Sequence, residues 1–388
     1  MRGAILGPLL RIGACALLFD ALVPLAPFLA AQTGRTHTAV QAAIAAGITG
    51  FAVAQLSAAP LLRRTGLRSG MIGSSVCLVG LGLLAACLPR SGGTLTLLVA
   101  MFLVNAPGSV AARAMLRNAL DHASFQCVIG RLYAALEAIE VFLPFAIITA
   151  ATVFDWRFPF VLICLAVLVS VLPVCLRHEQ AGIREETPRQ RSRPILFHRN
   201  FLAPALLMML IQGSFTAVAL AKPAILLEPL RFTPVELEVT LSALALLMVG
   251  GFHASSRSTR AMSDRARIRL GMLLQCASSV ALVLSAFAPN ALLFVGGCAL
   301  AALAYCALVP VLHALAMNRH EAARVDASAW LGFLQGAGSG AIVLAGSTAE
   351  LPAMTRLAST VTICTVLAVA ATLVLGRKTD APKCSQAA

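Results

Sequence analysis

Four ionisable residues stand out because they lie within, or directly beside, long apolar stretches of the chain. Asp20 lies in one such stretch, Glu137 and Glu140 lie in a second, and Lys222 directly follows a third. A charged side chain at mid-bilayer costs about 2.5–3.5 kcal/mol on insertion scales, and such residues usually mark proton or substrate pathways. We therefore expect the three carboxyl groups to take up and release protons, and Lys222 to contact a charged small molecule.

The sequence leaves a structural alternative open for each of these residues. Asp20 would then be a helix-packing carboxyl bonded to a neighbouring Ser or Thr. The long stem of Lys222 would carry its ammonium group to the outer interface. Glu228, also a candidate substrate contact, stands close enough to the end of its apolar stretch to be merely interfacial.

Glu137 and Glu140 have the spacing of neighbours on one helix face, roughly 5–6 Å apart at Cβ. At an effective dielectric of ~20, two negative charges at that separation repel by about 3 kcal/mol. We expect the pair to hold one shared proton near neutral pH. The alternative is a fully hydrated Glu137 beside a buried Glu140.

The composition shows what kind of element must position these residues. The chain has 388 residues, 59% of them hydrophobic and 12% charged, with a mean hydropathy of +0.87. Soluble domains carry about 25% charged residues. This balance excludes a soluble globular enzyme.

Apolar stretches long enough to cross a bilayer occur twelve times. About 20 helical residues span a ~30 Å hydrocarbon core, and spanning segments must be helices when they lack the alternation of a barrel. Ala288–Pro289–Asn290 divides one 49-residue uncharged run in two. The sequence thus predicts an all-α membrane protein of twelve transmembrane helices, with stretches at 12–34, 36–62, 69–89, 91–112, 132–154, 158–176, 200–221, 239–256, 270–318 (two), 327–349 and 357–376.

The distribution of basic residues predicts the topology, because positively charged loops stay in the cytoplasm. With a cytoplasmic N-terminus, 22 of the 30 Lys and Arg residues fall in inner segments and five fall outside. Both termini are then cytoplasmic, and the net charge of +14 reflects topology and contact with anionic lipids rather than nucleic-acid binding. The expected domains are a bundle over 1–176, a basic linker over 177–199, a bundle over 200–376 and a tail over 377–388.

Enzyme, metal and cofactor motifs are absent from the sequence. It holds no GxSxG, no HExxH, no CxxC and no nucleotide-binding loop followed by Lys. We expect neither an enzyme nor a cofactor nor a metal site. Energy for any transport must then come from an ion gradient.

Several segments resemble the Bcr/CflA group of drug/proton antiporters in the major facilitator superfamily. The stretch FDALVPLAPFL matches an Asp-x-x-x-Pro-x-x-Pro pattern at Asp20, Pro24 and Pro27, and GSVAARAMLRN and ASAWLGFLQG are close to family segments. The resemblance implies a major facilitator fold with a six-plus-six arrangement. It also implies substrate contacts at Gln335 and Glu228, and a gate formed by Arg64, Gly66, Arg68 and Arg113.

The chain also departs from the family pattern. Arg63 stands where family members carry an acidic residue, an apolar residue near Leu98 replaces an expected Arg, and Lys222 is unusual. The motif glycines of the fifth span are Ile147 and Ile148 here. Arg113 would anchor its helix at lipid headgroups or pair with a carboxylate of the fifth span.

The resemblance implies a monomeric secondary active transporter of the bacterial inner membrane that exports a drug or siderophore-like metabolite in exchange for protons. Two alternatives stay open. One is uptake by proton symport or uniport, and the other is a receptor or assembly factor on a transporter scaffold. The carboxylates favour a cationic or neutral amphiphile as the small-molecule substrate, whereas Lys222 favours an anion.

The topology makes a first prediction. A reporter fused after Arg193 should be active in the cytoplasm, and one fused after Arg90 should be active in the periplasm, because 22 basic residues hold the inner loops inside. Paired alkaline phosphatase and green fluorescent protein fusions measure both. The reverse pattern would overturn the orientation.

Overall fold

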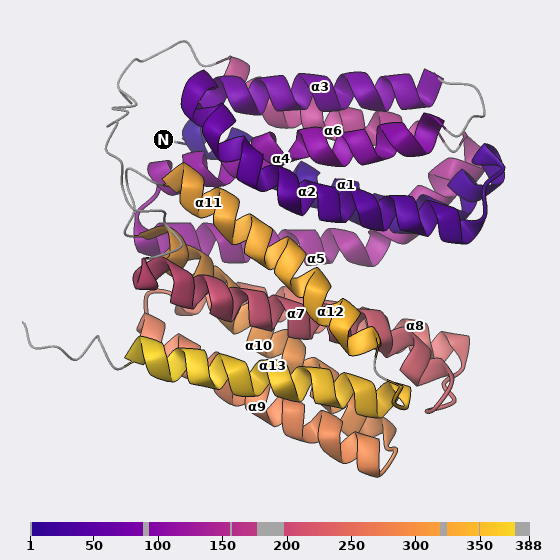
Figure 1. Ribbon diagram of the computed structural model, residues 1–388, viewed down its shortest axis with the longest axis vertical. Coiled ribbons are helices and arrows are strands. Elements are labelled where there is room, and N and C mark those ends of the chain that lie inside the picture. The colour runs from indigo at the N-terminus through magenta and orange to yellow at the C-terminus, as the bar shows by residue number, and fades with distance from the viewer. Residues whose placement is uncertain are drawn as a thin grey trace, which may run out of the picture.

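The computed structural model describes residues 2–87, 93–155, 157–176, 198–318, 324–348 and 350–376. All regular secondary structure in these ranges is helical, and the helices form two bundles of roughly parallel rods (Figure 1). The predicted linker over 177–199 lies outside the described residues except for its last two positions, and the predicted tail lies wholly outside them.

The first bundle contains six helices. They are α1 (Arg2–Thr33), α2 (His37–Thr65), α3 (Leu67–Cys87), α4 (Gly93–Ala119), α5 (His122–Val153) and α6 (Phe158–Cys175). The helix α5 bends by 44° between His122–Leu143 and Phe145–Val153. Pro144 stands at the bend, where a proline leaves one carbonyl without its intrahelical partner.

The second bundle contains the remaining elements. They are α7 (Arg199–Leu227), α8 (Pro234–Ser258), α9 (Asp264–Phe287), α10 (Ala291–Asn318), α11 (Arg324–Phe333), the π-helical turn η3 (Leu334–Gly338), α12 (Ser339–Ser347) and α13 (Ala353–Gly376). The run α11–η3–α12 is one continuous candidate span, Arg324–Ser347. Eleven helices of the described chain meet the length and hydropathy of a span, and bent α5 makes twelve. The twelve-helix prediction is confirmed.

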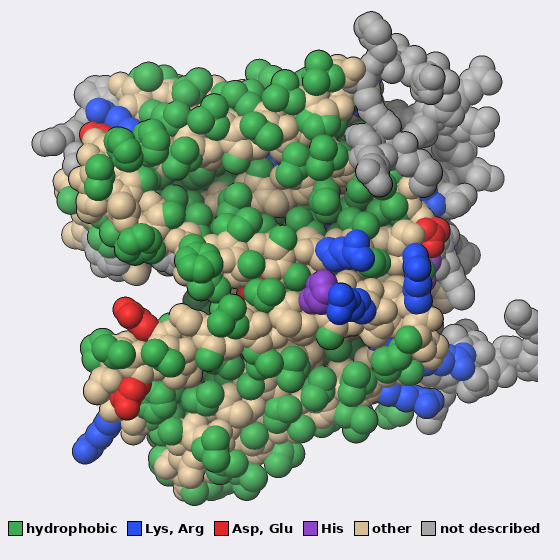
Figure 2. Space-filling model, turned by 180° about the vertical axis from the view of Figure 1, so that it is seen from behind, with side chains coloured by type: hydrophobic (Ala, Val, Ile, Leu, Met, Phe, Trp, Pro, Cys, Tyr) green, Lys and Arg blue, Asp and Glu red, His purple; other side chains and the backbone are tan. Residues whose placement is uncertain are grey.

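Large apolar side chains cover the outer surface, as expected of a protein solvated by lipid. Phe142, Phe145 and Leu273 are about 70% exposed, and hydrophobic side chains spread over the molecule (Figure 2). Inside, one cluster of buried apolar side chains fills the first bundle around Leu22 and Phe102, and another fills the second around Ile225 and Val361.

The two bundles are joined at one end only. There, Leu116 and Phe125 of the first bundle share a buried apolar cluster with Phe201 and Phe252 of the second. We call this the closed end; α2 finishes there, and α5 and α11 start there (Figure 1). At the opposite, open end the bundles diverge, and the space-filling view shows a hollow between them (Figure 2).

Polar contacts cross between the bundles at two places at the closed end. Arg63 of α2 forms an ion pair with Asp326 of α11, with Nη1 2.7 Å from both carboxylate oxygens. Next to it, Arg324 Nη1 donates to Asn118 Oδ1 at 2.7 Å. These contacts tie the start of α11 to the ends of α2 and α4.

A second contact ties the start of α5 to α9. His122 Nε2 lies 2.7 Å from Asp264 Oδ2, and Gln126 Nε2 donates to Asp264 Oδ1 at 2.9 Å. Buried Arg267 donates to Gln126 Oε1 and extends this network into the second bundle. The closed end therefore has one permanently charged inter-bundle contact and one that includes a histidine.

The Arg63–Asp326 ion pair gives a prediction about conformation. The pair is partly exposed and is worth about 0.5–1 kcal/mol, so Asp326→Asn should raise the population opened at this end by about two- to fivefold. Spin labels at Ser69 and Ser258, on a background without native cysteines, report that opening as longer distances.

The neighbouring Arg64 supplies the matched control, because its side chain is exposed and forms no ion pair in the described structure. Arg64→Gln should leave the distances unchanged. The double exchange Arg63→Asp with Asp326→Arg should restore the closed distances. Identical distributions in Asp326→Asn and the unmodified protein would show that the ion pair does not hold this end shut.

Candidate functional site

Three carboxyl groups gather in the middle of the first bundle. Asp20 of α1 and Glu140 of α5 have carboxyl groups within hydrogen-bonding reach of each other. Glu137, one turn earlier on α5, acts electrostatically on both. Two carboxylates this close would repel each other if both were ionised, so the arrangement favours a proton on one of them. The structure thus brings together the three predicted proton-coupling residues, which we call the acidic cluster.

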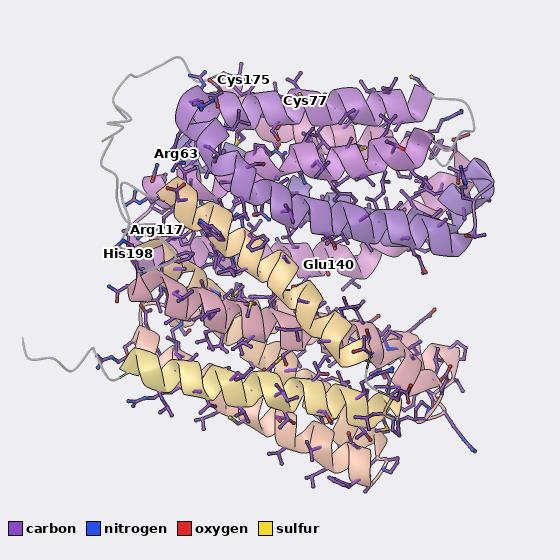
Figure 3. The ribbon with its side chains drawn as sticks, in the orientation of Figure 1. Arg63, Cys77, Arg117, Glu140, Cys175 and His198 are labelled. Atoms are coloured by element: carbon purple, nitrogen blue, oxygen red, sulfur yellow. The ribbon has the colours of Figure 1, made fainter. Side chains whose placement is uncertain are left out.

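The acidic cluster faces the space between the bundles. Glu140 is exposed although it lies well inside the length of α5, and its side chain lies on the side of α5 that borders that space (Figure 3). Asp20 and Glu137 are partly buried. The alternative of an exposed Glu137 beside a buried Glu140 does not hold, since Glu140 is the more exposed residue of the pair. The bend of α5 and the separation of the bundles expose it.

The second bundle contributes Lys222 to the same region. Lys222 of α7 is partly buried and is an electrostatic partner of Glu137. Its charge therefore faces the carboxylates across the interface between the bundles. Glu228 is exposed and caps the far end of α7, and it takes no part in the cluster.

A second polar layer lies nearer the closed end. The Tyr305 hydroxyl donates to Gln212 Oε1 at 2.7 Å, and Gln335 Nε2 donates to the same oxygen at 3.0 Å. The Tyr305 ring stacks on Phe215 with centroids 4.2 Å apart. Gln335 lies in the π-helical turn η3, a feature that often occurs at functional sites.

The Gln335 side chain also lies close to Tyr133 of α5 and His313 of α10. The Tyr133 and His313 rings lie 6.3 Å apart. The predicted substrate contact at Gln335 is therefore placed where side chains of both bundles meet.

Arg113 lies where the polar region between the bundles ends towards the closed end, and we call the region around Arg113 the floor. Its guanidinium donates to Gln55 of α2 and to the Ser109 carbonyl, and it acts electrostatically on Tyr133 and His313. The ion pair with a carboxylate of α5 considered from the sequence is not formed. The reason is distance along the helices, since Arg113 lies close to the closed end of α4 while Glu137 and Glu140 lie far up α5.

Gly332 of α11 closes the floor. A Cβ atom at this position would lie 1.7 Å from Gln55 Oε1 and 2.5 Å from Arg113 Nη2. A side chain at this position would displace Gln55 and Arg113 from their present places against α11. The contact places the predicted gating residue Arg113 between the bundles.

The other predicted gating residues lie outside this floor. Gly66 has φ 83° and its N–H bonds to the Leu62 carbonyl at 2.8 Å, so it reverses the chain after α2. Arg68 Nη2 donates to the Cys175 carbonyl at 3.5 Å, within the first bundle. Arg64 is exposed. The inter-bundle contact is made by Arg63, the position that departs from the family pattern.

Sequence reasoning missed a buried arginine. Arg11 of α1 is fully buried and donates to Asn105 Oδ1 at 2.6 Å, Ser75 Oγ at 3.0 Å and Ser74 Oγ at 3.4 Å. Its Nη1 has no hydrogen-bond partner among the described residues. The polar positions Ser74, Ser75 and Asn105 inside apolar spans were the available signal.

No group of three or more His, Cys, Asp or Glu side chains in the described ranges has the geometry of a metal site. The arrangement instead offers ionisable carboxyls, hydrogen-bonding amides, aromatic rings and one arginine around the interface between two bundles. Such a set can bind a small polar molecule and a proton, and it carries no nucleophile with an activating base.

Comparison with known proteins identifies the family. The profile of the Major Facilitator Superfamily matches residues 12–343. No functionally curated protein matches the chain.

Among solved structures, the bacterial homologue of the iron transporter ferroportin in its outward-facing state is similar at a TM-score of 0.75 and 14% identity, covering 96% of this chain and 99% of that one. The proton:xylose symporter XylE is similar at 0.72 and 13%, covering 97% and 94%. The human organic anion transporter MFSD10 is similar at 0.71 and 16%, covering 96% and 99%. This chain is a multi-pass membrane protein that belongs to the major facilitator superfamily of secondary transporters.

Proposed function

We propose that this protein is a proton-coupled antiporter that exports a small molecule across a bacterial inner membrane. The observation that carries the proposal is the contact between the carboxyl groups of Asp20 and Glu140, joined by Glu137 and faced by Lys222. This cluster lies at the hydrated interface of the two bundles, where a proton and a cationic substrate compete for the same carboxylates.

The orientation supports export. Basic side chains and histidine gather at the closed end in the view of Figure 2, which favours a cytoplasmic position for this end by the positive-inside rule. The hollow at the open end then faces the periplasm, the source of protons. A proton entering there reaches Glu140 first, because Glu140 is the exposed member of the cluster.

The exchange cycle requires the closed end and the open end to open alternately. With the closed end shut by the Arg63–Asp326 and His122–Asp264 contacts, the cluster takes a proton from outside and releases substrate. When those contacts break and the other end closes, the cluster meets the cytoplasm. A substrate cation then displaces the proton from the cluster. This displacement couples the export of substrate to the entry of protons.

The first test of the proposal uses Asp20→Asn. An amide cannot exchange a proton, so transport driven by a pH gradient should fall by at least about tenfold while the protein still inserts, since proton transfer alone contributes on this scale. The substrate is first found by untargeted comparison of metabolites exported by a deletion strain and its complemented parent.

In everted vesicles with an acidic interior, adding that substrate should dissipate the pH gradient, read as recovery of acridine orange fluorescence. Asp20→Asn should abolish the recovery but keep exchange of labelled for unlabelled substrate. Substrate movement that follows the proton would show symport, movement indifferent to the gradient would show a uniporter, and no flux would show a non-transporting scaffold. Each of these results contradicts antiport.

A second test asks which carboxyl shares the proton with Asp20. The contact with Asp20 favours Glu140, so Glu140→Gln should remove the pH dependence of transport between pH 6 and 8 as completely as Asp20→Asn, because either change breaks the carboxyl pair. Glu137→Gln should keep a pH dependence and change mainly the apparent affinity for substrate.

Glu228→Gln is the matched control for a glutamate outside the cluster and should behave as the unmodified protein. Equal loss of pH dependence in Glu137→Gln and Glu140→Gln would restore the pairing expected from the sequence. Unchanged pH profiles in both would remove the acidic cluster from proton coupling.

A further inference from the structure

We infer that the transported molecule is amphoteric, with an anionic group that binds Arg113 and a cationic group that binds the acidic cluster. The inference rests on the proposed function in one respect, that the interface between the bundles is the transport route. It adds a second charged subsite, at the floor of that route.

No carboxylate among the described residues forms an ion pair with the positively charged Arg113 side chain. In the described structure, neither the Arg63–Asp326 ion pair nor the His122–Asp264 contact includes Arg113. Its described hydrogen-bond acceptors, Gln55 and the Ser109 carbonyl, are neutral. Its side chain is still partly solvent-accessible. A guanidinium group has five N–H donors, and two of those of Arg113 are in use. The remaining donors can bind a planar anion.

Comparison with Arg11 shows that the surroundings of Arg113 are not shared by every interior arginine of this bundle. Arg11 is 0% exposed, is enclosed by α1, α3 and α4, and donates to three side chains of its own bundle. Arg113 instead lies against Gly332 of the opposite bundle and beside Tyr133 and His313. Arg11 therefore stabilises the fold of one bundle. Arg113 lies instead where it can contact one end of a ligand bound between the bundles.

The acidic cluster has the opposite charge. Asp20, Glu137 and Glu140 supply three carboxyl groups, and Lys222 supplies one ammonium group that faces them. Because the carboxyl groups outnumber the ammonium group, the cluster can offer a carboxylate to a single amine or other monocation.

The two subsites are close enough for one small molecule. Both Arg113 and Glu137 act electrostatically on the Tyr133 hydroxyl, so both charges lie near Tyr133. Tyr133 and Glu137 are one helical turn apart, a rise of roughly 6 Å. Gln335 and Gln212 provide neutral hydrogen-bonding groups beside this path, and the stacked rings of Tyr305 and Phe215 provide an apolar wall. An amino acid or short peptide-like molecule has matching charges and length.

The test uses matched ligands that differ only in charge. The probes are phenylalanine and alanyl-phenylalanine, each also as its methyl ester, which keeps only the amine, and as its N-acetyl form, which keeps only the carboxylate. Binding to the purified full-length protein is measured from the shift in melting temperature over a concentration series up to 10 mM.

For at least one of the two scaffolds, the zwitterion should bind about tenfold tighter than either singly charged form, the scale of one charge-assisted bidentate contact. Arg113→Gln should reduce that preference over the ester to less than about threefold and leave the affinity for the ester unchanged. Arg113→Lys should recover part of the preference, and Arg64→Gln should keep all of it. Size-exclusion profiles confirm that each variant is folded.

Three results would overturn the inference. They are an ester that binds as tightly as its zwitterion in the unmodified protein, equal weakening of ester and zwitterion by Arg113→Gln, and no binding of any probe at 10 mM. Failure of the proposed function looks different. Zwitterions that bind through Arg113 but produce no proton-driven flux would refute antiport alone, and a purely cationic compound exported against protons independently of Arg113 would refute only the amphoteric substrate.

Discussion

The constraint on which this structure depends is that hydrocarbon cannot solvate polar groups. It forces the backbone into helices, because only helices satisfy every interior N–H and C=O within one segment. It also confines charged side chains to the seams between helices or to the hydrated space between bundles. The position of each ionisable residue inside a span therefore depends on the groups that compensate its charge.

Arg11 and Arg113 of the first bundle illustrate two kinds of compensation. Arg11 is surrounded by Asn105, Ser74 and Ser75, whose dipoles replace water and lock three helices together. Arg113 has fewer partners and lies at the surface where the bundles meet. The first arrangement is rigid and remote from solvent, whereas the second can change when the bundles move, which is what a residue of the transport route requires.

The same reasoning explains why the bundles can separate. Within each bundle, buried apolar side chains form continuous cores, and these are costly to open. Between the bundles, the closed end is held by a limited apolar cluster, the Arg63–Asp326 ion pair, the His122–Asp264 contact and hydrogen bonds such as Arg324 to Asn118. Contacts of this kind are individually weak and partly hydrated, so they exchange readily for an alternative set.

The sequence by itself determined the helical class, the number of spans and the candidate residues Asp20, Glu137, Glu140, Lys222 and Gln335, because an uncharged run of about 20 residues and a charge within it are local features. Only the tertiary structure decided their partners. It paired Glu140 with Asp20 rather than with Glu137, gave Arg113 a glutamine instead of a carboxylate, and used Arg63 at the gate. Arg11 was missed because its partners lie 63 to 94 residues away along the chain. Helix rotation, the bend at Pro144 and the separation of the bundles set these pairings, and all three arise from packing between segments distant in sequence.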